Sequence, residues 1–175
     1  MTKVSGLAAA ASLLATHELA VNEAGVSKKV TGAQVRAFAI ANLGASGYQA
    51  VAQSLVSAVA ARLAFDTAQY TDGNLDLVTN KGRYTVPAGG AGKYLVIGGF
   101  VVGAAGILQL YLYKNGVLYR NHSPATGAAT QIYGSGIIRL AAADYIELWA
   151  YQSAATQNTS PGATTCWMDI QFLGS

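Results

Sequence analysis

Three short stretches contain residue types that could bind phosphate, bind calcium or catalyse acid–base reactions. The first, PAGGAGKY at residues 87–94, resembles a phosphate-binding loop, in which glycine N–H groups surround the phosphate. That loop requires a glycine where this chain has Pro87 and a Ser or Thr where it has Tyr94. A strand-like apolar run follows, so no helix N-terminus would face the phosphate. We therefore predict a turn between strands at this position.

The other two stretches involve carboxylates. Residues 72–76, DGNLD, place oxygen-bearing side chains at alternate positions, as calcium loops do, but Leu77 replaces the required glycine and no glutamate closes the loop. Asp144 and Glu147 could form a catalytic carboxylate pair, yet a spacing of three puts them on opposite faces of a strand. The sequence thus predicts no catalytic residue, no metal ligand and no cofactor, and we expect that the protein is not an enzyme.

The composition predicts a protein whose surface is covered by other subunits. Of the 175 residues, 52% are hydrophobic and 11% charged, against about 25% charged in an average soluble domain. A surface so poor in charge indicates coverage by identical copies or by a larger assembly. The net charge of +3 is spread thinly, which argues against a nucleic-acid partner. No apolar run approaches the ~20 residues that span a bilayer, so we expect no membrane insertion.

The N-terminal part is predicted to be a small α/β module. The Ala/Leu-rich residues 6–16 imitate a signal peptide, but the residues after them make a poor cleavage site, so we expect a retained helix. Residues 17–21 and 26–30 are predicted to form a short hairpin. Thr31 is the expected N-cap of a helix that ends near the glycines at 44–47. A second helical stretch is expected from Tyr48 to about residue 60.

The C-terminal part is predicted to be an antiparallel sandwich. Residues 108–113 alternate between leucine and polar or aromatic side chains, as in a strand with two different faces. Asn115-Gly116 then predicts a tight hairpin. About eight short strands separated by turn residues favour a jelly roll. The predicted fold class is mainly β: an N-terminal module at 1–48, a connecting helix or linker at 49–60, and an antiparallel jelly-roll sandwich at 61–175.

One predicted strand, residues 93–102, is apolar on both faces and is therefore expected to be covered on both sides. Because a two-layer sandwich buries one side in its core, we expect the other side to face a neighbouring subunit. The candidates for this interface are Tyr94, Val96, Phe100 and Val102. Cys166 lies in a strand-like run and is predicted to be a buried structural thiol.

Aromatic residues are numerous in the β domain, and the sequence leaves their roles open. Roughly half or more are expected in the core, and the others could stack on sugar rings or fill a subunit interface. They are Tyr111, Tyr113, Tyr119, Tyr133, Tyr145, Trp149, Tyr151 and Trp167.

Several motifs of the β domain are similar to those of the complement globular head and the tumour-necrosis-factor superfamily. They are residues 62–65, 84–87, 92–96, 113–116, 140–148 and 172–174. Two departures are Ala143, where glycine is usual, and extra residues at 88–90. The resemblance covers about residues 60–175 and implies a ten-stranded jelly roll that forms homotrimers.

The N-terminal part resembles a short module of bacteriophage virion proteins, in which an acidic residue and leucine open a strand and a Lys-Lys-Val-Thr motif leads into a helix. The matching ranges are residues 18–21 and 28–34. Such modules sit at the virion-attached end of fibres and decorations. The resemblance implies docking by Leu19, Val21, Lys28, Lys29, Val30, Thr31 and Gln34.

Together the two resemblances imply a homotrimeric tail-fibre-type protein of a virion assembled in the host cytoplasm. Its N-terminus would dock on tail or capsid proteins, and its head would project toward a host-surface glycan or protein. Because loops carry recognition on such scaffolds, the candidate receptor-binding loops are Tyr119, Arg120, Asn121, His122, Gln157, Asn158 and Thr159. The first alternative, favoured by the absence of a long shaft, is a capsid decoration, cement or head-fibre protein. An alternative of another class is a secreted carbohydrate-binding module, which the lack of a convincing signal peptide disfavours.

Overall fold

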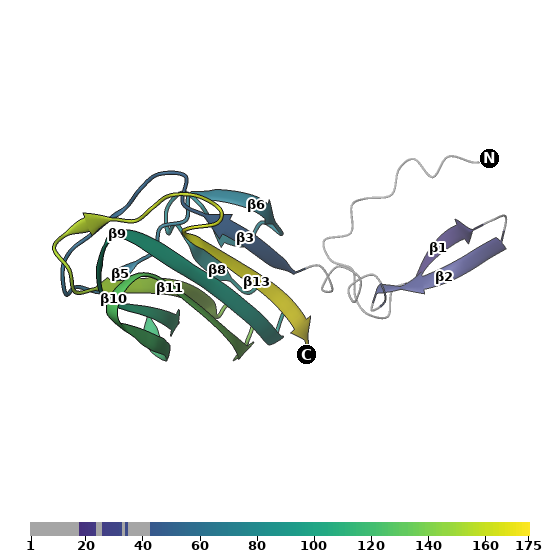
Figure 1. Ribbon diagram of the computed structural model, residues 1–175. Helices are drawn as coiled ribbons and strands as arrows, with labels where there is room; N and C mark the ends of the chain where they lie inside the picture. Colours follow the sequence, from purple (N-terminus) through teal and green to yellow (C-terminus); the bar gives the residue numbers. More distant parts are fainter. Residues whose placement is uncertain (1–17, 24–25, 33, 35–42) are drawn as a thin grey trace. The chain divides into compact units, whose positions relative to one another are not determined.

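The computed structural model describes residues 18–23, 26–32, 34 and 43–175 (Figure 1). The chain divides into two compact units, Met1–Ala41 and Asn42–Ser175. The β unit therefore begins well before residue 61, where the sequence predicted it. Among the described residues, no helix is long and apolar enough to cross a membrane.

The N-terminal unit contains the predicted hairpin. Strands β1 (Glu18–Glu23) and β2 (Val26–Thr31) pair antiparallel, with Glu18 opposite Thr31. The N–H of Gln34 donates to Oγ1 of Thr31 at 3.2 Å, and the N–H of Thr31 donates to Oε1 of Gln34 at 2.8 Å. This reciprocal pair is a capping box, which confirms Thr31 as an N-cap. The helices predicted for residues 6–16 and after residue 34 lie outside the described residues.

The second unit consists of strands joined by turns. Their bounds are β3 (Gly44–Tyr48), β4 (Ser54–Leu55), β5 (Ala61–Arg62), β6 (Thr67–Thr71), β7 (Leu75–Asp76), β8 (Arg83–Thr85), β9 (Gly92–Lys114), β10 (Val117–Leu140), β11 (Tyr145–Gln152), β12 (Gln157–Asn158) and β13 (Trp167–Gly174). The main sheet has the order β6-β3-β13-β9-β11-β8-β7, with β10 also on β9 and β5 also on β11. All pairings are antiparallel.

Two long strands, β9 and β10, divide this sheet into the two layers of a sandwich. Residues 93–99 of β9 pair with β13, and residues 108–114 pair with β11. Strand β10 follows β9 along both halves, with register shifts between Leu118 and Arg120 and between His122 and Gln131. The first half joins β6, β3 and β13 in what we term the β13 layer (Figure 1). The second half joins β11, β5, β8 and β7 in the β11 layer.

The core lies between the layers and contains the leucines whose alternation was seen in the sequence. Leu108, Leu110 and Leu112 are at most 1% exposed. The hairpin after them is also as predicted, because Asn115 and Gly116 have φ of 52° and 78° and join Lys114 to Val117.

The predicted interface residues of β9 lie in this same core. Tyr94, Val96, Phe100 and Val102 are 0–3% exposed within a single chain. The prediction that they face another subunit is therefore wrong. Both faces of the strand are apolar, so the pattern did not indicate which face points inward. The outward side chains are instead Leu95, Ile97 and Val101, which are partly exposed.

The helix predicted from Tyr48 to residue 60 is also wrong. Tyr48 ends β3, and residues 54–55 form β4, which pairs with β12. Gln53 replaces helical hydrogen bonds with bonds to distant segments: its N–H donates to Oγ1 of Thr159 at 2.9 Å, and its Nε2 donates to the carbonyl of Arg62 at 2.7 Å. Three valines in this stretch also lower its helix propensity.

The two suspected binding loops are turns, as the sequence predicted. The N–H of Gly90 donates to the carbonyl of Pro87 at 3.0 Å, and strand β9 follows. In the acidic stretch, Oδ1 of Asp72 accepts from the N–H of Asn74 at 3.0 Å, and Oδ2 accepts from the N–H of Gly44 at 3.0 Å and the Tyr84 hydroxyl at 2.7 Å. The Asp72 carboxylate thus holds the turn to β3 and β8.

Candidate functional site

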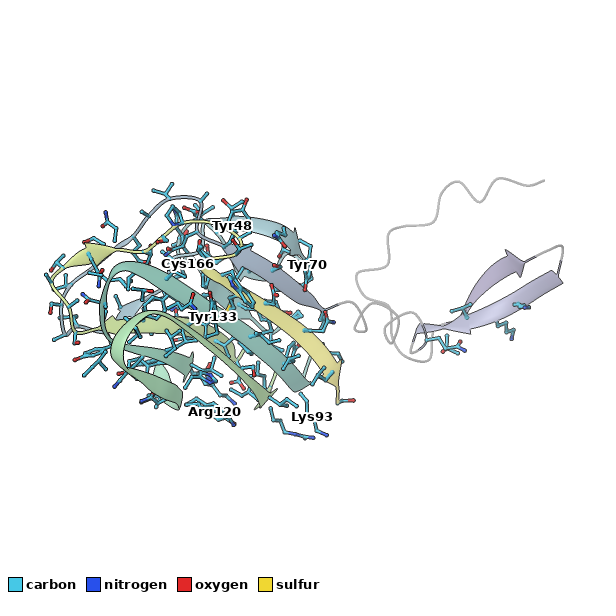
Figure 2. The ribbon with its side chains drawn as sticks, in the orientation of Figure 1. Tyr48, Tyr70, Lys93, Arg120, Tyr133 and Cys166 are labelled. Atoms are coloured by element: carbon cyan, nitrogen blue, oxygen red, sulfur yellow. The ribbon has the colours of Figure 1, made fainter. Side chains whose placement is uncertain are left out.

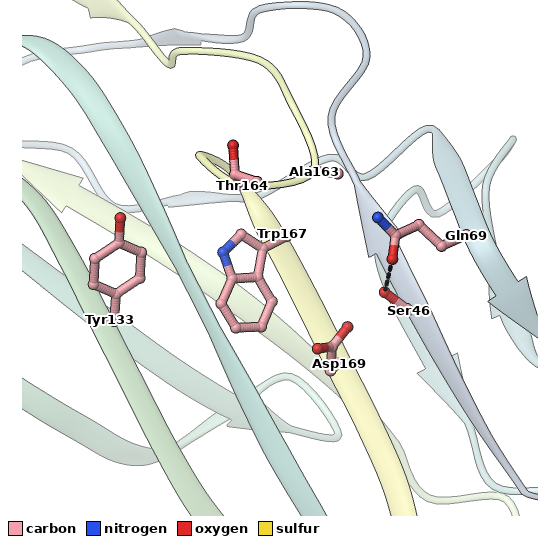
Figure 3. Close-up of a pocket in the computed structure, with 7 residues that line it drawn as sticks. All are labelled: Ser46, Gln69, Tyr133, Ala163, Thr164, Trp167 and Asp169. Carbon is pink, nitrogen blue, oxygen red and sulfur yellow. Dashed lines mark hydrogen bonds between the residues drawn. The ribbon is translucent and has the colours of Figure 1, made fainter.

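A cavity of about 500 Å³ opens on the outer face of the β13 layer (Figure 3). Its walls come from β3, β6, β10, β13 and the residues before β13: Ser46, Gln69, Tyr133, Ala163, Thr164, Trp167 and Asp169. The sheet register brings these residues together, because Ser46 lies opposite Asp169, and Gly99 of β9 lies opposite both Trp167 and Tyr133.

Gly99 allows the Tyr133 ring to form one wall of the cavity. A Cβ atom on residue 99 would lie 2.3 Å from Cδ1 of Tyr133. The ring therefore lies over bare backbone, and Trp167 follows on the other side of the glycine (Figure 3). Tyr133 and Trp167 thus lie on either side of Gly99. A larger side chain at residue 99 would occupy the space that the Tyr133 ring takes.

The polar groups of the cavity include one carboxylate that has no partner. Oγ of Ser46 donates to Oε1 of Gln69 at 3.5 Å, which is a weak contact. Among the side-chain carboxylates of residues 43–175, Asp169 alone makes no hydrogen bond or ion pair. The pKa of Tyr70 is raised, first by burial and then by the negative charges of Asp169 and Asp72. Asp169 is therefore free to accept hydrogen bonds or to pair with a cation.

Several large apolar side chains are exposed on the outer face around the cavity. Tyr70, Tyr133, Ile137 and Leu173 are 48–54% exposed. Partly exposed Leu95, Ile97 and Val101 lie on the same side of β9. The described residues contain no group of three or more His, Cys, Asp or Glu side chains that could hold a metal ion. The site offers aromatic, apolar and polar surface to a binding partner.

The first predicted receptor-binding segment lies within strand β10. Tyr119, Arg120 and Asn121 are exposed, and His122 is partly buried. The segment is therefore not a loop, because Arg120, Asn121 and His122 pair with residues 110–112 of β9. Burial and the positive charge of Arg120 lower the pKa of His122.

The second predicted receptor-binding segment, residues 157–159, contains a short strand and a buried side chain. Gln157 and Asn158 form β12, while Thr159 is only 2% exposed. The Thr159 hydroxyl donates to Oε1 of Gln49 at 2.6 Å and accepts from the N–H of Gln53 at 2.9 Å. A side chain buried in this way cannot contact a receptor, so Thr159 was a wrong candidate.

The docking candidates lie on the N-terminal hairpin and just after it. Lys28, Lys29 and Gln34 are exposed, and Val30 and Thr31 are partly exposed. In the hairpin register, Leu19 lies opposite Val30, and Val21 lies opposite Lys28.

The outer face of the β11 layer carries most of the remaining aromatic residues. They are Tyr111, Tyr113, Tyr145, Trp149 and Tyr151, all partly exposed. The rings of Tyr113 and Trp149 stack with centroids 4.7 Å apart, and the Arg83 guanidinium lies 3.9 Å from the centroid of Tyr145. The sequence could not separate these residues from core aromatics.

A carboxylate with three donors lies among these rings. Glu147 is 3% exposed, and its Oε1 accepts from Arg62 at 2.8 Å and from Arg83 at 2.9 Å. Its Oε2 accepts from Nε1 of Trp149 at 3.1 Å. Asp144 pairs instead with Nζ of Lys114 at 2.8 Å. The two carboxylates are therefore held by different cations.

Cys166 is fully buried, as the sequence predicted. Burial, followed by the negative charge of Asp66, raises the pKa of its thiol to about 12. The thiol is therefore neutral and poorly nucleophilic near neutral pH.

Solved structures with the same fold are jelly-roll head domains. Murine APRIL at pH 8.0 superimposes with a TM-score of 0.57 and 11% identity, over 74% of this chain and 98% of APRIL. The Eiger TNF from S. frugiperda gives 0.53 and 12%, over 76% and 93%. The globular domain of zebrafish complement 1qA protein gives 0.51 and 11%, over 76% and 98%.

No protein-family model and no curated protein sequence matches the chain. At these identities the structural likeness concerns the fold, and it confirms the fold that the sequence motifs implied. The second unit is an antiparallel jelly roll of the kind found in the tumour-necrosis-factor family and in complement globular heads.

Proposed function

We propose that the chain is a structural protein of a bacteriophage virion, a homotrimer of the tail-fibre type. In this proposal the N-terminal unit docks on the particle, and the jelly roll is the outward head. Two features support it: the jelly-roll fold, whose sequence motifs imply a trimer, and the capped hairpin at residues 18–34, which resembles a virion module. A capsid decoration protein is the alternative to a tail fibre.

The observation that carries self-association is the apolar outer face of the β13 layer. Tyr70, Tyr133, Ile137 and Leu173 are each about half exposed there. Burial of such side chains stabilises an assembly by roughly 25 cal/mol per Å² of apolar surface. Exposed apolar surface that gathers on one face marks interaction sites.

Replacing Ile137 with arginine is expected to dissociate the trimer. The side chain is 54% exposed, so the change leaves the core intact and places a charge on the proposed interface. Size-exclusion chromatography with light scattering should report three times the chain mass of 18.0 kDa for the natural protein and the single-chain mass for the variant.

Val117→Arg is the matched control, because Val117 is 70% exposed at the β9–β10 hairpin, away from that face. It should keep the trimer mass. A natural protein that is monomeric at micromolar concentration, or a trimeric Ile137→Arg variant, would contradict self-association through this face.

The virion assignment is tested by locating the protein on purified particles with labelled antibody. Label at the tail supports a tail fibre, and label on the capsid supports a decoration protein. Purified particles that carry no copy of the chain would rule out both.

A second candidate function, carbohydrate binding, is favoured by the aromatic outer face of the β11 layer. Aromatic rings offer apolar faces that stack on sugars, and tyrosine hydroxyls add hydrogen bonds. Retardation of the protein in gels that contain host-surface polysaccharide would support this function. Tyr111→Ser should then weaken the retardation several-fold, whereas Tyr70→Ser on the opposite layer should not. Equal retardation of both variants would exclude this face.

A further inference from the structure

The outer face of the β11 layer carries two guanidiniums beside its aromatic rings, and they share one carboxylate. Arg62 donates from Nη1 to Oε1 of Glu147 at 2.8 Å. Arg83 donates from Nε to the same oxygen at 2.9 Å and places its Nη2 at 2.9 Å from it. Within residues 43–175 neither arginine forms an ion pair with another carboxylate. The cluster therefore keeps one positive charge that no side chain of this range compensates.

Both guanidiniums have N–H groups that Glu147 does not use. The side chains of Arg62 and Arg83 are 28% and 27% exposed, whereas that of Glu147 is 3% exposed and its second oxygen accepts from Nε1 of Trp149. Nε and Nη2 of Arg62, and Nη1 of Arg83, make no hydrogen bond to a residue that the structure describes. The Arg83 guanidinium is also fixed over the Tyr145 ring. A positioned guanidinium with unused N–H groups can bind a second carboxylate.

The sheet register places an aromatic strip directly beside these cations. Trp149 of β11 lies opposite Arg62 of β5 on one side and opposite Tyr111 of β9 on the other. Its ring stacks on that of Tyr113, with centroids 4.7 Å apart and planes 23° from parallel. Residues that lie opposite each other on one face of a sheet are about 5 Å apart. A single sugar ring can therefore contact the aromatic strip while a group attached to it reaches a guanidinium.

We propose that the outer face of the β11 layer binds polysaccharides that contain uronic acids. A uronate residue combines an apolar ring face, which stacks on aromatic side chains, with a planar carboxylate, which accepts hydrogen bonds from a guanidinium. In this contact the sugar ring lies on Trp149 and Tyr113, and its carboxylate accepts from the unused N–H groups of the two arginines. The uncompensated positive charge selects an acidic sugar over a neutral one. The inference rests on the carbohydrate binding proposed for this face and specifies the class of sugar.

Isothermal titration calorimetry with short oligomers of galacturonate and of glucuronate tests the proposal. At least one of the two oligomers should bind at physiological salt. Its carboxyl-reduced form has the same rings without the negative charge and should bind at least about tenfold more weakly, because the charge-assisted hydrogen bonds to the arginines are lost. Oligoglutamate has carboxylates without sugar rings and should also bind at least about tenfold more weakly, since nothing stacks on the aromatic strip.

Two variants assign the contact to this face. Arg62→Gln should raise the dissociation constant of the acidic oligomer at least about tenfold, and it leaves Arg83 and Glu147 as a balanced pair. Tyr113→Ser should raise the constant about fivefold through lost stacking. Lys93→Gln is the matched control, because it removes the same charge from an exposed residue of β9 that pairs with β13 (Figure 2). It should leave the constant unchanged, and thermal melting followed by circular dichroism shows that each variant is folded.

The outcomes separate this inference from carbohydrate binding itself. Equal affinity for the acidic and the carboxyl-reduced oligomer would overturn the inference and leave carbohydrate binding in place. Oligoglutamate that binds as tightly as the sugar oligomers would show a site for acidic peptides and would also overturn it. If neither uronate oligomer binds while host-surface polysaccharide still retards the protein, the inference alone fails; without retardation, carbohydrate binding fails too. A folded Arg62→Gln variant with the natural affinity would exclude the arginines as the carboxylate site.

Discussion

Replacing Glu147 with glutamine is expected to lower the free energy of unfolding by about 3 kcal/mol near pH 7. The Glu147 carboxylate is 3% exposed and balances two guanidiniums, those of Arg62 and Arg83. Without its charge, both cations remain partly buried beside each other with no counter-ion. Removal of one member of a buried ionic group is costly because the remaining charges keep their desolvation penalty.

The effect of this substitution should depend on pH. Burial raises the pKa of Glu147, but hydrogen bonds from Arg62, Trp149 and Arg83 outweigh it, so the pKa lies below the usual 4.5. A lowered pKa in the folded state stabilises the protein above the unfolded-state pKa, and this stability is lost as the pH falls through the folded value. The difference between the natural protein and Glu147→Gln should therefore shrink as the pH falls below 4.5.

Urea unfolding, followed by tryptophan fluorescence at several pH values, measures both effects. Asp144→Asn is the comparison, because Asp144 pairs with Lys114 at the surface and its pKa is lowered to about 2, mainly by Lys114 and Asn115. Its loss should be much smaller at neutral pH, since exposed ion pairs contribute little. If Glu147→Gln were as stable as Asp144→Asn, the three-donor cluster would not contribute to folding as we describe.

The parts of the fold that the sequence predicted correctly are set by local signals. Asn115-Gly116 adopts the positive φ values of a tight hairpin, which these two residue types favour. Leu108, Leu110 and Leu112 alternate with polar or aromatic residues, so one face was identifiable as the inner one. Thr31 and Gln34 cap each other across three residues. Each signal lies within a few residues of the structure that it specifies.

The wrong predictions concern segments whose structure is decided elsewhere in the chain. Tyr94 and Leu95 are neighbours of similar apolarity, and the inward position of Tyr94 depends on which side the β11 layer covers. Residues 48–60 have helical spacing of apolar residues, but Gln53 bonds to Thr159 and Arg62 instead. The spacing of apolar residues within a segment does not indicate hydrogen bonds to residues far along the chain.

The candidate site is likewise assembled by sheet register. Ser46, Gln69, Tyr133 and Trp167 are spread over more than a hundred residues and meet through β3, β6, β10 and β13. One local signal was present, because Asp169 is the single charge in the strand-like run at 167–174. A lone carboxylate in an apolar strand indicates a specific partner, although the sequence does not say which.

Replacing Gly98 with valine is expected to lower the free energy of unfolding by about 3 kcal/mol. A Cβ atom on residue 98 would lie 2.5 Å from Cδ1 of Leu148 and 2.6 Å from the carbonyl oxygen of Trp167. The leucine could change rotamer, but the carbonyl belongs to β13, which is paired with β9 at this position. The added side chain therefore separates the two strands or the two layers of the sandwich.

Gly103→Val is the matched control on the same strand, because no heavy atom lies within 4 Å of a Cβ atom there. Valine favours strands, so this change should alter the free energy of unfolding by less than about 0.5 kcal/mol. Urea unfolding of both variants separates steric cost from the general effect of replacing a glycine in β9. Similar losses for the two variants would show that Gly98 is not required by packing, because only residue 98 of the pair contacts the β11 layer and β13.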